Sequence, residues 1–185
     1  MAEGKVANPG PLGLAGFALT TFVLSCQNAG LIPNEGGLWA MVPLALFYGG
    51  LAQMIAGVLE FRTGNTFGVA AFTSYGAFWM ALAFLVIFMR IGIIPEKGFG
   101  DALGIFLLAW TIFTTYMTIL TFSSKHGTLI AIFVVLEITF ILLVIGHYSG
   151  SGGITKIGGW TGIITAFLAW YGSWEGIKPQ FSAAE

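Results

Sequence analysis

Long apolar stretches alternate with short polar ones along the chain. A helix that crosses a bilayer needs about 20 mostly apolar residues, and six stretches of this chain qualify. The separators carry most of the charged residues, and the glycine-rich stretch 149–159 is expected to form the fifth turn. The pattern predicts an all-α membrane protein with transmembrane helices at residues 11–29, 38–59, 67–89, 102–122, 128–147 and 158–174.

The composition excludes a soluble globular protein. Apolar residues make up 57% of the 185 residues and charged residues only 8%, whereas globular domains carry roughly 25% charged residues. The mean hydropathy is +0.90. The net charge is −1 and the basic residues are scattered singly, so no surface for nucleic acid is expected. The lone Cys26 lies in an apolar stretch and is interpreted as a small buried hydrophobic residue.

A short internal repeat relates three of the predicted helices. Residues 11–17 and 66–72 share Gly, Ala and Phe at matching places, and the fainter copy 127–133 keeps the Ala and the Phe. The simplest architecture is three helix hairpins around a pseudo-threefold axis, with the odd-numbered helices lining a central pathway. The repeat places side chains in two layers, one of Phe17, Phe72 and Phe133, the other of Thr20, Tyr75 and Leu136.

Two asparagines precede helix starts in equivalent places. Asn8 and Asn65 each come just before a copy of the repeat, where a side-chain oxygen can cap free backbone N–H groups. A helix N-terminus also favours an anion, so capping and a contact with a passing carboxylate both stay open. Glu60 is expected to anchor the following loop, by pairing with Arg62 or by capping the next helix.

Three polar side chains within or near the ends of spans are candidates for function. Gln53 lies deep in the second span, where an interhelical hydrogen bond and a hydrogen bond to substrate are equally plausible. Glu137 is the only acid clearly inside a span; it could be protonated, hydrogen-bonded between subunits, or a site of proton coupling. His147, near the end of the fifth span, could add pH sensitivity or simply lie exposed to solvent.

The start of the first span carries a longer motif. It reads Asn-Pro-Gly-Pro-Leu-Gly-Leu-Ala-Gly-Phe over residues 8–17, and three further motifs follow at 48–53, 64–68 and 72–76. In this order they resemble the acetate uptake transporter family, the succinate–acetate permeases. The resemblance covers essentially the whole chain, with one departure: Gly10 stands where the family usually has Ala or Val.

The resemblance implies both a function and a site. It implies passage of acetate, with other small monocarboxylates and succinate, through a narrow apolar gate formed by Phe17, Tyr75 and Leu136. It also implies a homo-oligomer, a hexamer with one pathway in each subunit, in the plasma membrane with both termini cytoplasmic. From the residues alone, aromatic side chains at helical spacing are as readily explained by packing. A channel and a proton-coupled carrier both stay open.

Other function classes find little support in the sequence. No Walker-type loop, no His/Cys cluster with metal-ligand spacing and no Ser/His/Asp set is found, so no cofactor, metal or enzymatic activity is expected. The alternatives are an intramembrane enzyme that uses Glu137, His147 and Ser149, and a purely structural membrane protein. The chain is expected to form a single domain, 1–185.

Overall fold

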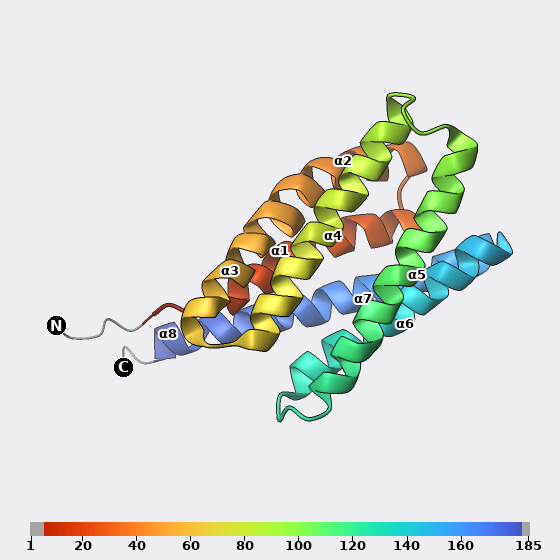
Figure 1. Ribbon diagram of the computed structural model, residues 1–185. Helices are drawn as coiled ribbons and strands as arrows, with labels where there is room; N and C mark the ends of the chain where they lie inside the picture. The colour runs from red at the N-terminus through yellow and green to blue at the C-terminus, as the bar shows by residue number, and fades with distance from the viewer. Residues whose placement is uncertain (1–5, 183–185) are drawn as a thin grey trace.

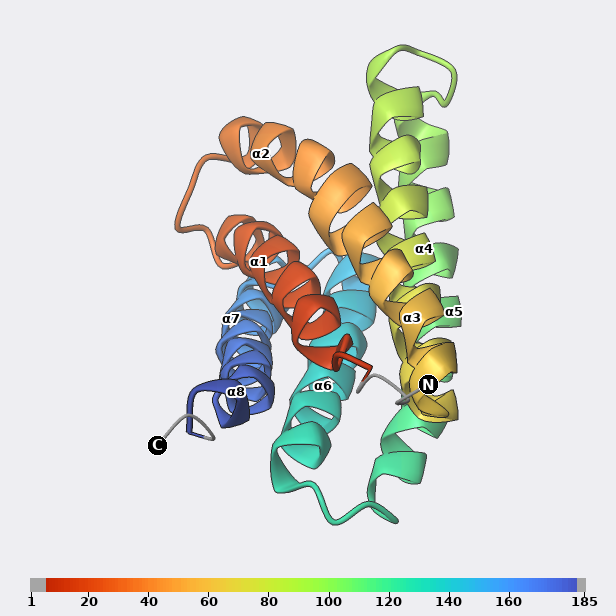
Figure 2. The same cartoon turned by 90° about the vertical axis from the view of Figure 1, so that its left-hand side faces the viewer.

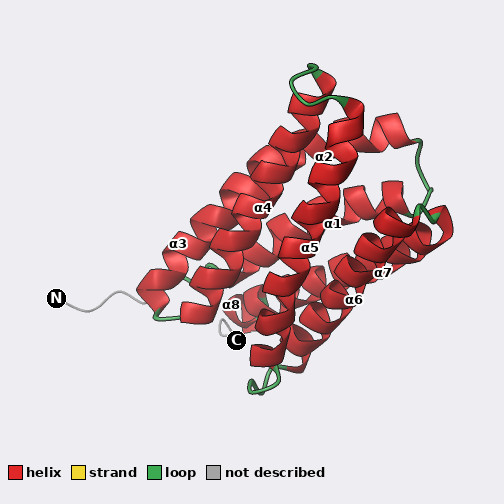
Figure 3. Ribbon diagram, turned by 45° about the vertical axis from the view of Figure 1, so that its right-hand side comes forward, coloured by secondary structure: helices red, strands yellow, loops and turns green. Residues whose placement is uncertain are grey.

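The computed structural model describes residues 6–182 of the chain. The first five and the last three residues of the predicted domain therefore lie outside the described part. The described part is helical, with short loops and no strand (Figure 3). Its elements are α1 (Gly10–Asn28), α2 (Asn34–Leu46), the π-helix η1 (Phe47–Ala52), α3 (Gln53–Thr63), α4 (Thr66–Arg90), α5 (Glu96–Thr121), α6 (Gly127–Ser149), α7 (Gly152–Ile177) and the short α8 (Pro179–Ser182).

The helices pack as a ring in chain order. α1 packs against α2, η1 and α3 on one side and against α7 on the other, and α3, α4, α5, α6 and α7 each contact the next (Figures 1 and 2). The contact between α7 and α1 closes the ring. The start of α1 and the end of α7 lie at the same end of the bundle, as expected for an even number of spans. The pseudo-threefold relation between the hairpins stays a prediction.

Length and hydropathy identify most of the predicted spans. Within residues 6–182, five helical segments are long and apolar enough to cross a membrane. The remaining predicted span corresponds to α7, which has 26 residues and packs between α1 and α6, but it is not among those five; its crossing of the membrane stays a prediction. The five segments are Gly10–Asn28, Gly36–Thr63, Thr66–Arg90, Gly98–Thr121 and Gly127–Ser149.

The predicted glycine-rich turn at 149–159 is wrong in extent. α6 ends at Ser149 and is capped by Gly150, whose φ of +66° is a left-handed conformation that suits glycine, and α7 begins at Gly152. Ser151 caps α7 by accepting a hydrogen bond from the N–H of Ile154 at 3.4 Å. Further along α7, Gly158 and Gly159 face close neighbours. A Cβ built on Gly159, for example, would overlap the backbone of Ala29, the residue that follows α1.

The second predicted span is interrupted by the π-helix η1. A π-helix accommodates an extra residue in the turn and changes which side chains face the bundle after it. Its backbone lies against α1: a Cβ built on Gly16 would lie 2.5 Å from the carbonyl oxygen of Tyr48. Gln53 follows directly at the start of α3 and is buried. The interruption therefore decides the direction of this side chain.

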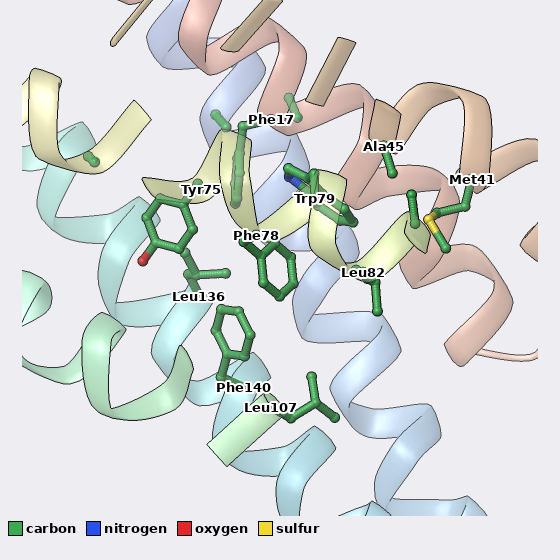
Figure 4. Close-up of a cluster of buried hydrophobic side chains, with 14 of the residues drawn as sticks. Phe17, Met41, Ala45, Tyr75, Phe78, Trp79, Leu82, Leu107, Leu136 and Phe140 are labelled. Carbon is green, nitrogen blue, oxygen red and sulfur yellow. The ribbon is translucent and has the colours of Figure 1, made fainter. Parts of the chain in front are cut away.

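Aromatic side chains fill the middle of the ring. Phe78 of α4 lies within 5.0–5.6 Å, between ring centroids, of Trp79, Phe106, Trp110 and Phe140. Figure 4 shows Phe78, Trp79 and Phe140 of this cluster among other buried side chains. The backbones of α4 and α6 are not close neighbours, so side chains of these two helices bridge the space between them.

Candidate transport pathway

Two cavities occupy opposite ends of the bundle. The larger, about 660 Å³, is lined at its outer end by residues at the start of α1, the end of α3, the start of α4 and the loop between α5 and α6. The smaller, about 310 Å³, is lined by residues at the opposite ends of α1, α4 and α6 and by the starts of α2, α5 and α7. Both are lined mostly by apolar side chains, as is typical of small-molecule sites.

The three residues of the implied gate lie where the two cavities meet. Phe17 and Leu136 line both cavities, and Tyr75 lines the larger one. Their exposed fractions are 5%, 5% and 3%, and the rings of Phe17 and Tyr75 have centroids 5.8 Å apart. Figure 4 shows the three side chains reaching from α1, α4 and α6 toward one region. Among the described residues, Phe17 and Leu136 are the two that line both cavities.

The hydroxyl of Tyr75 is already engaged. It lies 2.9 Å from Oγ1 of Thr114 in α5, and that threonine donates its own hydrogen to the carbonyl of Trp110 at 2.8 Å. Because a threonine hydroxyl has one hydrogen, Tyr75 is the donor in the pair. The phenol therefore offers a ligand lone pairs rather than a free O–H, unless it first leaves Thr114.

All three residues of the predicted aromatic layer line the larger cavity, whereas those of the second layer do so only in part. Phe17, Phe72 and Phe133 all line the larger cavity. Thr20 lines neither cavity: it is fully buried, donates to the carbonyl of Gly16 at 3.0 Å and packs against Gly49 of η1. Thr20 therefore faces η1, and the next residue, Thr21, lines the smaller cavity instead; a place for Thr20 on the substrate pathway stays a prediction.

Both candidate asparagines accept a hydrogen bond at the start of a helix, Asn65 as the N-cap of α4 and Asn8 just before Pro9, the N-cap of α1. Asn8 accepts a hydrogen bond from the N–H of Gly10, and Asn65 from that of Gly68, each at 3.0 Å. Both also line the larger cavity. The side-chain oxygen of each asparagine is therefore used in a backbone hydrogen bond. Both side chains still border the cavity through which a ligand would enter.

Glu60 anchors the loop between α3 and α4, but not through Arg62. Its Oε2 accepts hydrogen bonds from Oγ1 of Thr63 at 2.8 Å and from Nδ2 of Asn65 at 3.0 Å. The side chain is 2% exposed and lines the larger cavity. Arg62 is exposed on the neighbouring face of α3. The sequence indicated that Glu60 anchors this loop. Its position in the cavity wall follows only from the packing of α1 and α4 around it.

Gln53 lines the larger cavity with an amide oxygen that has no hydrogen-bond partner in the described part of the chain. The side chain is 1% exposed. Burial of an unpaired amide oxygen is unfavourable, so the interhelical hydrogen bond considered from the sequence does not account for this atom. A ligand or water in the cavity would satisfy it.

The two candidates for proton coupling lie in different places. His147 lines the smaller cavity and its Nε2 lies 2.8 Å from the carbonyl oxygen of Gly100; since a carbonyl only accepts, that nitrogen carries hydrogen. Glu137 lines neither cavity and accepts a hydrogen bond from Oγ1 of Thr115 at 2.7 Å, between α6 and α5. Ser149 donates to the carbonyl of Ile145 in its own helix. The three residues of the alternative enzyme site are therefore not brought together.

Several functional candidates in the smaller cavity were missed from the sequence. Thr21 and Trp79 line it and are buried, and Oγ1 of the threonine and Nε1 of the indole lack partners among the described residues. Helical periodicity could have identified Thr21, because it continues the spacing of three or four residues from Leu14 and Phe17 to Leu24 and Asn28, beside which Ser25 and Gln27 also line the smaller cavity. Among residues 6–182, no group of three or more His, Cys, Asp or Glu residues is placed to hold a metal ion.

Comparison with known proteins identifies relatives along nearly the whole chain. Ammonia transport outward protein 2 of Saccharomyces cerevisiae is 45% identical over 185 residues, covering 95% of this chain and 63% of the yeast protein. The succinate-acetate/proton symporter SatP of Escherichia coli K12 is 40% identical over 173 residues, covering 92% of this chain and 88% of the relative. The chain thus spans 63% of the length of the yeast protein and most of the bacterial one.

A solved structure is also similar. The structure of the bacterial acetate channel SatP matches with a TM-score of 0.88 at 38% sequence identity, covering 96% of each chain. The model of the GPR1/FUN34/yaaH family matches residues 1–183. The chain therefore belongs to the GPR1/FUN34/yaaH family.

Proposed function

We propose that this protein passes acetate across a membrane, together with other small monocarboxylates and succinate. The observation that carries the proposal is that two cavities from opposite ends of the bundle meet on the side chains of Phe17 and Leu136. Relatives named as an acetate permease and as a succinate-acetate/proton symporter support the substrate class.

The gate in this proposal is the layer of Phe17, Tyr75 and Leu136. An apolar constriction selects by size and by the ease of wetting. A two-carbon acid needs little widening of the layer, whereas a bulkier acid must displace packed aromatic walls, which costs energy. Gln53, Asn8 and Asn65 border the larger cavity as polar contacts for the carboxylate, and Phe72 and Phe133 form its apolar wall.

The mechanism is a channel or a proton-coupled carrier. Within the described residues no lysine or arginine lines either cavity, so an unaccompanied carboxylate finds no counter-charge at the gate. Passage with a proton, or as the neutral acid, avoids the cost of taking a bare charge through an apolar layer. The sequence offers two ionisable side chains to carry this proton. They are His147 in the smaller cavity and Glu137 between α5 and α6.

The biological unit in this proposal is a homo-oligomer, a hexamer, whose subunits each carry a complete pathway. The support is that residues of one chain line both cavities. The protein acts as a single domain over 1–185, without a cofactor and without enzymatic activity, in the plasma membrane with both termini cytoplasmic. Several long apolar helices and the transporter names of relatives support the membrane location.

The test is uptake of labelled acetate into proteoliposomes, with protein-free liposomes subtracted. Native protein and Leu136→Ala are compared with Ile138→Ala, a control whose side chain is exposed on the outside of α6. We expect Leu136→Ala to raise the uptake of a larger acid relative to acetate by about tenfold, and the control to behave as native. Absence of protein-dependent acetate flux would refute the function, and unchanged selectivity in Leu136→Ala would refute the gate.

A further inference from the structure

We propose that Glu60 is the side chain that takes up the proton accompanying the carboxylate. This inference rests on the proposed function. It differs from the assignments suggested by the sequence, because Glu137 and His147 do not line the larger cavity whereas Glu60 does.

Glu60 is held at the outer end of the larger cavity between two helix starts. A Cβ built on Gly68, in the first turn of α4, would lie 2.9 Å from Cγ and Cδ of the glutamate. A Cβ built on Gly10, at the start of α1, would lie 3.3 Å from its Oε1. The two glycines therefore leave the space that the carboxyl group occupies, and the group is almost fully buried there.

The two carboxyl oxygens have different surroundings. Oε2 accepts a hydrogen bond from Nδ2 of Asn65 and lies 2.8 Å from Oγ1 of Thr63, whose single hydrogen is shared with the carbonyl oxygen of Glu60 at 2.9 Å. Oε1 faces Gly10 and has no donor among the described residues. Oε1 is therefore the oxygen on which a proton can be placed without displacing a hydrogen bond.

The charge balance at this end couples Glu60 to an entering anion. The N-terminus of a helix acts as about half a positive charge, and the first turns of α1 and α4 both contact Glu60. The partial positive charges of these two helix N-termini together roughly offset the negative charge of the ionised Glu60 carboxylate. A second carboxylate then gains nothing from the helix ends and is repelled by the first. Protonation of Glu60 frees both helix ends for the substrate.

Few other ionisable groups compete for this role. The residues that face Glu60 are Asn8 and Gly10 from the α1 side and Asn65 and Gly68 from the α4 side, and none of them ionises. On its own helix Arg62 is exposed. The other ionisable side chains that line the cavity are Tyr75, whose hydroxyl is bonded to Thr114, and His126 in the exposed loop between α5 and α6.

The proposed step conserves the proton. A proton from water at the outer end of the cavity binds Oε1 of Glu60. The neutral carboxyl group donates an O–H···O hydrogen bond to the substrate carboxylate. The O–H bond of the glutamic acid then breaks as an O–H bond forms on the substrate, which crosses the apolar layer as the neutral acid. Glu60 is left as the carboxylate and binds the next proton.

The experiment compares native protein, Glu60→Gln and the control Glu175→Gln in proteoliposomes. Glu175 is exposed on α7 and lines neither cavity. Uptake of labelled acetate is measured against external pH at a constant concentration of the acetate anion, with the membrane potential set by potassium and valinomycin. Native and control uptake should fall about tenfold for each unit by which the external pH rises, because one proton is bound per acetate, and should not respond to the membrane potential. Uptake by Glu60→Gln should be independent of pH and respond to the potential.

The outcomes separate this inference from the proposed function. No native acetate flux refutes the function itself. Native flux together with an unchanged pH profile in Glu60→Gln refutes the role of Glu60 alone, and a uniform loss of rate at every pH shows a structural role only.

A labelling measurement on the native protein covers the case in which the variant does not fold. A hydrophobic carbodiimide reacts with protonated buried carboxyl groups, and mass spectrometry locates the adduct. We expect the adduct on Glu60, increasing as the pH falls and suppressed by acetate. Inhibition of transport with the adduct on another acid would overturn the assignment.

Discussion

The hydroxyl of Ser173 in α7 donates to the carbonyl oxygen of Pro11 in α1 at 2.8 Å, in a buried position. The two residues are 162 positions apart in the chain. This contact joins the end of the last long helix to the first turn of the first one, beside the outer end of the larger cavity. The ring is therefore closed there by a specific hydrogen bond as well as by apolar packing.

Ser173→Ala should lower the stability of the bundle without changing its selectivity. A hydrogen bond between membrane helices is worth about 0.6 kcal/mol, and the carbonyl of Pro11 keeps its bond within α1, so the loss should be about that size. Thermal unfolding in detergent measures the effect. Ser149→Ala is the control, because Ser149 bonds only to its own helix, at Ile145. Equal melting temperatures for the two variants would contradict the prediction.

Tyr75→Phe should retain acetate uptake within a few-fold of native, because the phenol donates to Thr114 rather than to the cavity. Tyr75→Phe and Thr114→Val should each cost about 0.6 kcal/mol of stability, and the double variant little more than either alone. The measurements are uptake into proteoliposomes and thermal unfolding of all three variants. The prediction is contradicted if Tyr75→Phe loses most of the uptake and the stability losses of Tyr75→Phe and Thr114→Val add up in the double variant. The hydroxyl of Tyr75 would then bind the substrate rather than Thr114.

Gly16→Ala should be destabilising by about 1–3 kcal/mol, because its methyl group would lie 2.5 Å from the carbonyl oxygen of Tyr48. Separation of α1 from η1 also moves Gln53, whose Cβ would lie 3.6 Å from the new methyl group, so acetate uptake should fall as well. Gly36→Ala is the matched control, since its methyl group would meet no atom within 4 Å. Thermal unfolding and uptake are compared; a neutral Gly16→Ala would show that the helices separate freely.

Glu137→Gln should leave the pH profile of acetate uptake as in the native protein, since Glu137 lines neither cavity. Its stability should be unchanged or higher, because a charged side chain within a membrane helix is unfavourable, while the glutamine oxygen can still accept from Thr115. The uptake assay with an imposed pH gradient tests this. If Glu137→Gln lost the pH dependence of uptake and Glu60→Gln behaved as native, Glu137 in α6 would be the site of proton coupling.

Much of the fold follows from local sequence. Runs of apolar residues predict the helices because a bilayer sets their length, and the spans at 11–29, 67–89 and 128–147 agree with α1, α4 and α6 within two residues at each end. Glycine-rich sequence misled the prediction at 149–159: glycine marks a turn when it has a positive φ, as at Gly150, but a helix contact when it faces another backbone, as at Gly159.

The candidate site depended on packing between distant segments. The family resemblance and the internal repeat pointed to Phe17, Tyr75 and Leu136, but only the tertiary structure decided that they lie where two cavities meet. It also decided that Thr21 rather than Thr20 faces the smaller cavity, and that Glu60 faces the larger one. The physical reason is that helical periodicity is a local property, whereas the direction in which a helix face points is set by its neighbours. In this chain those neighbours include the π-helix η1 and the contact of α7 with α1, and both depend on residues far apart in sequence.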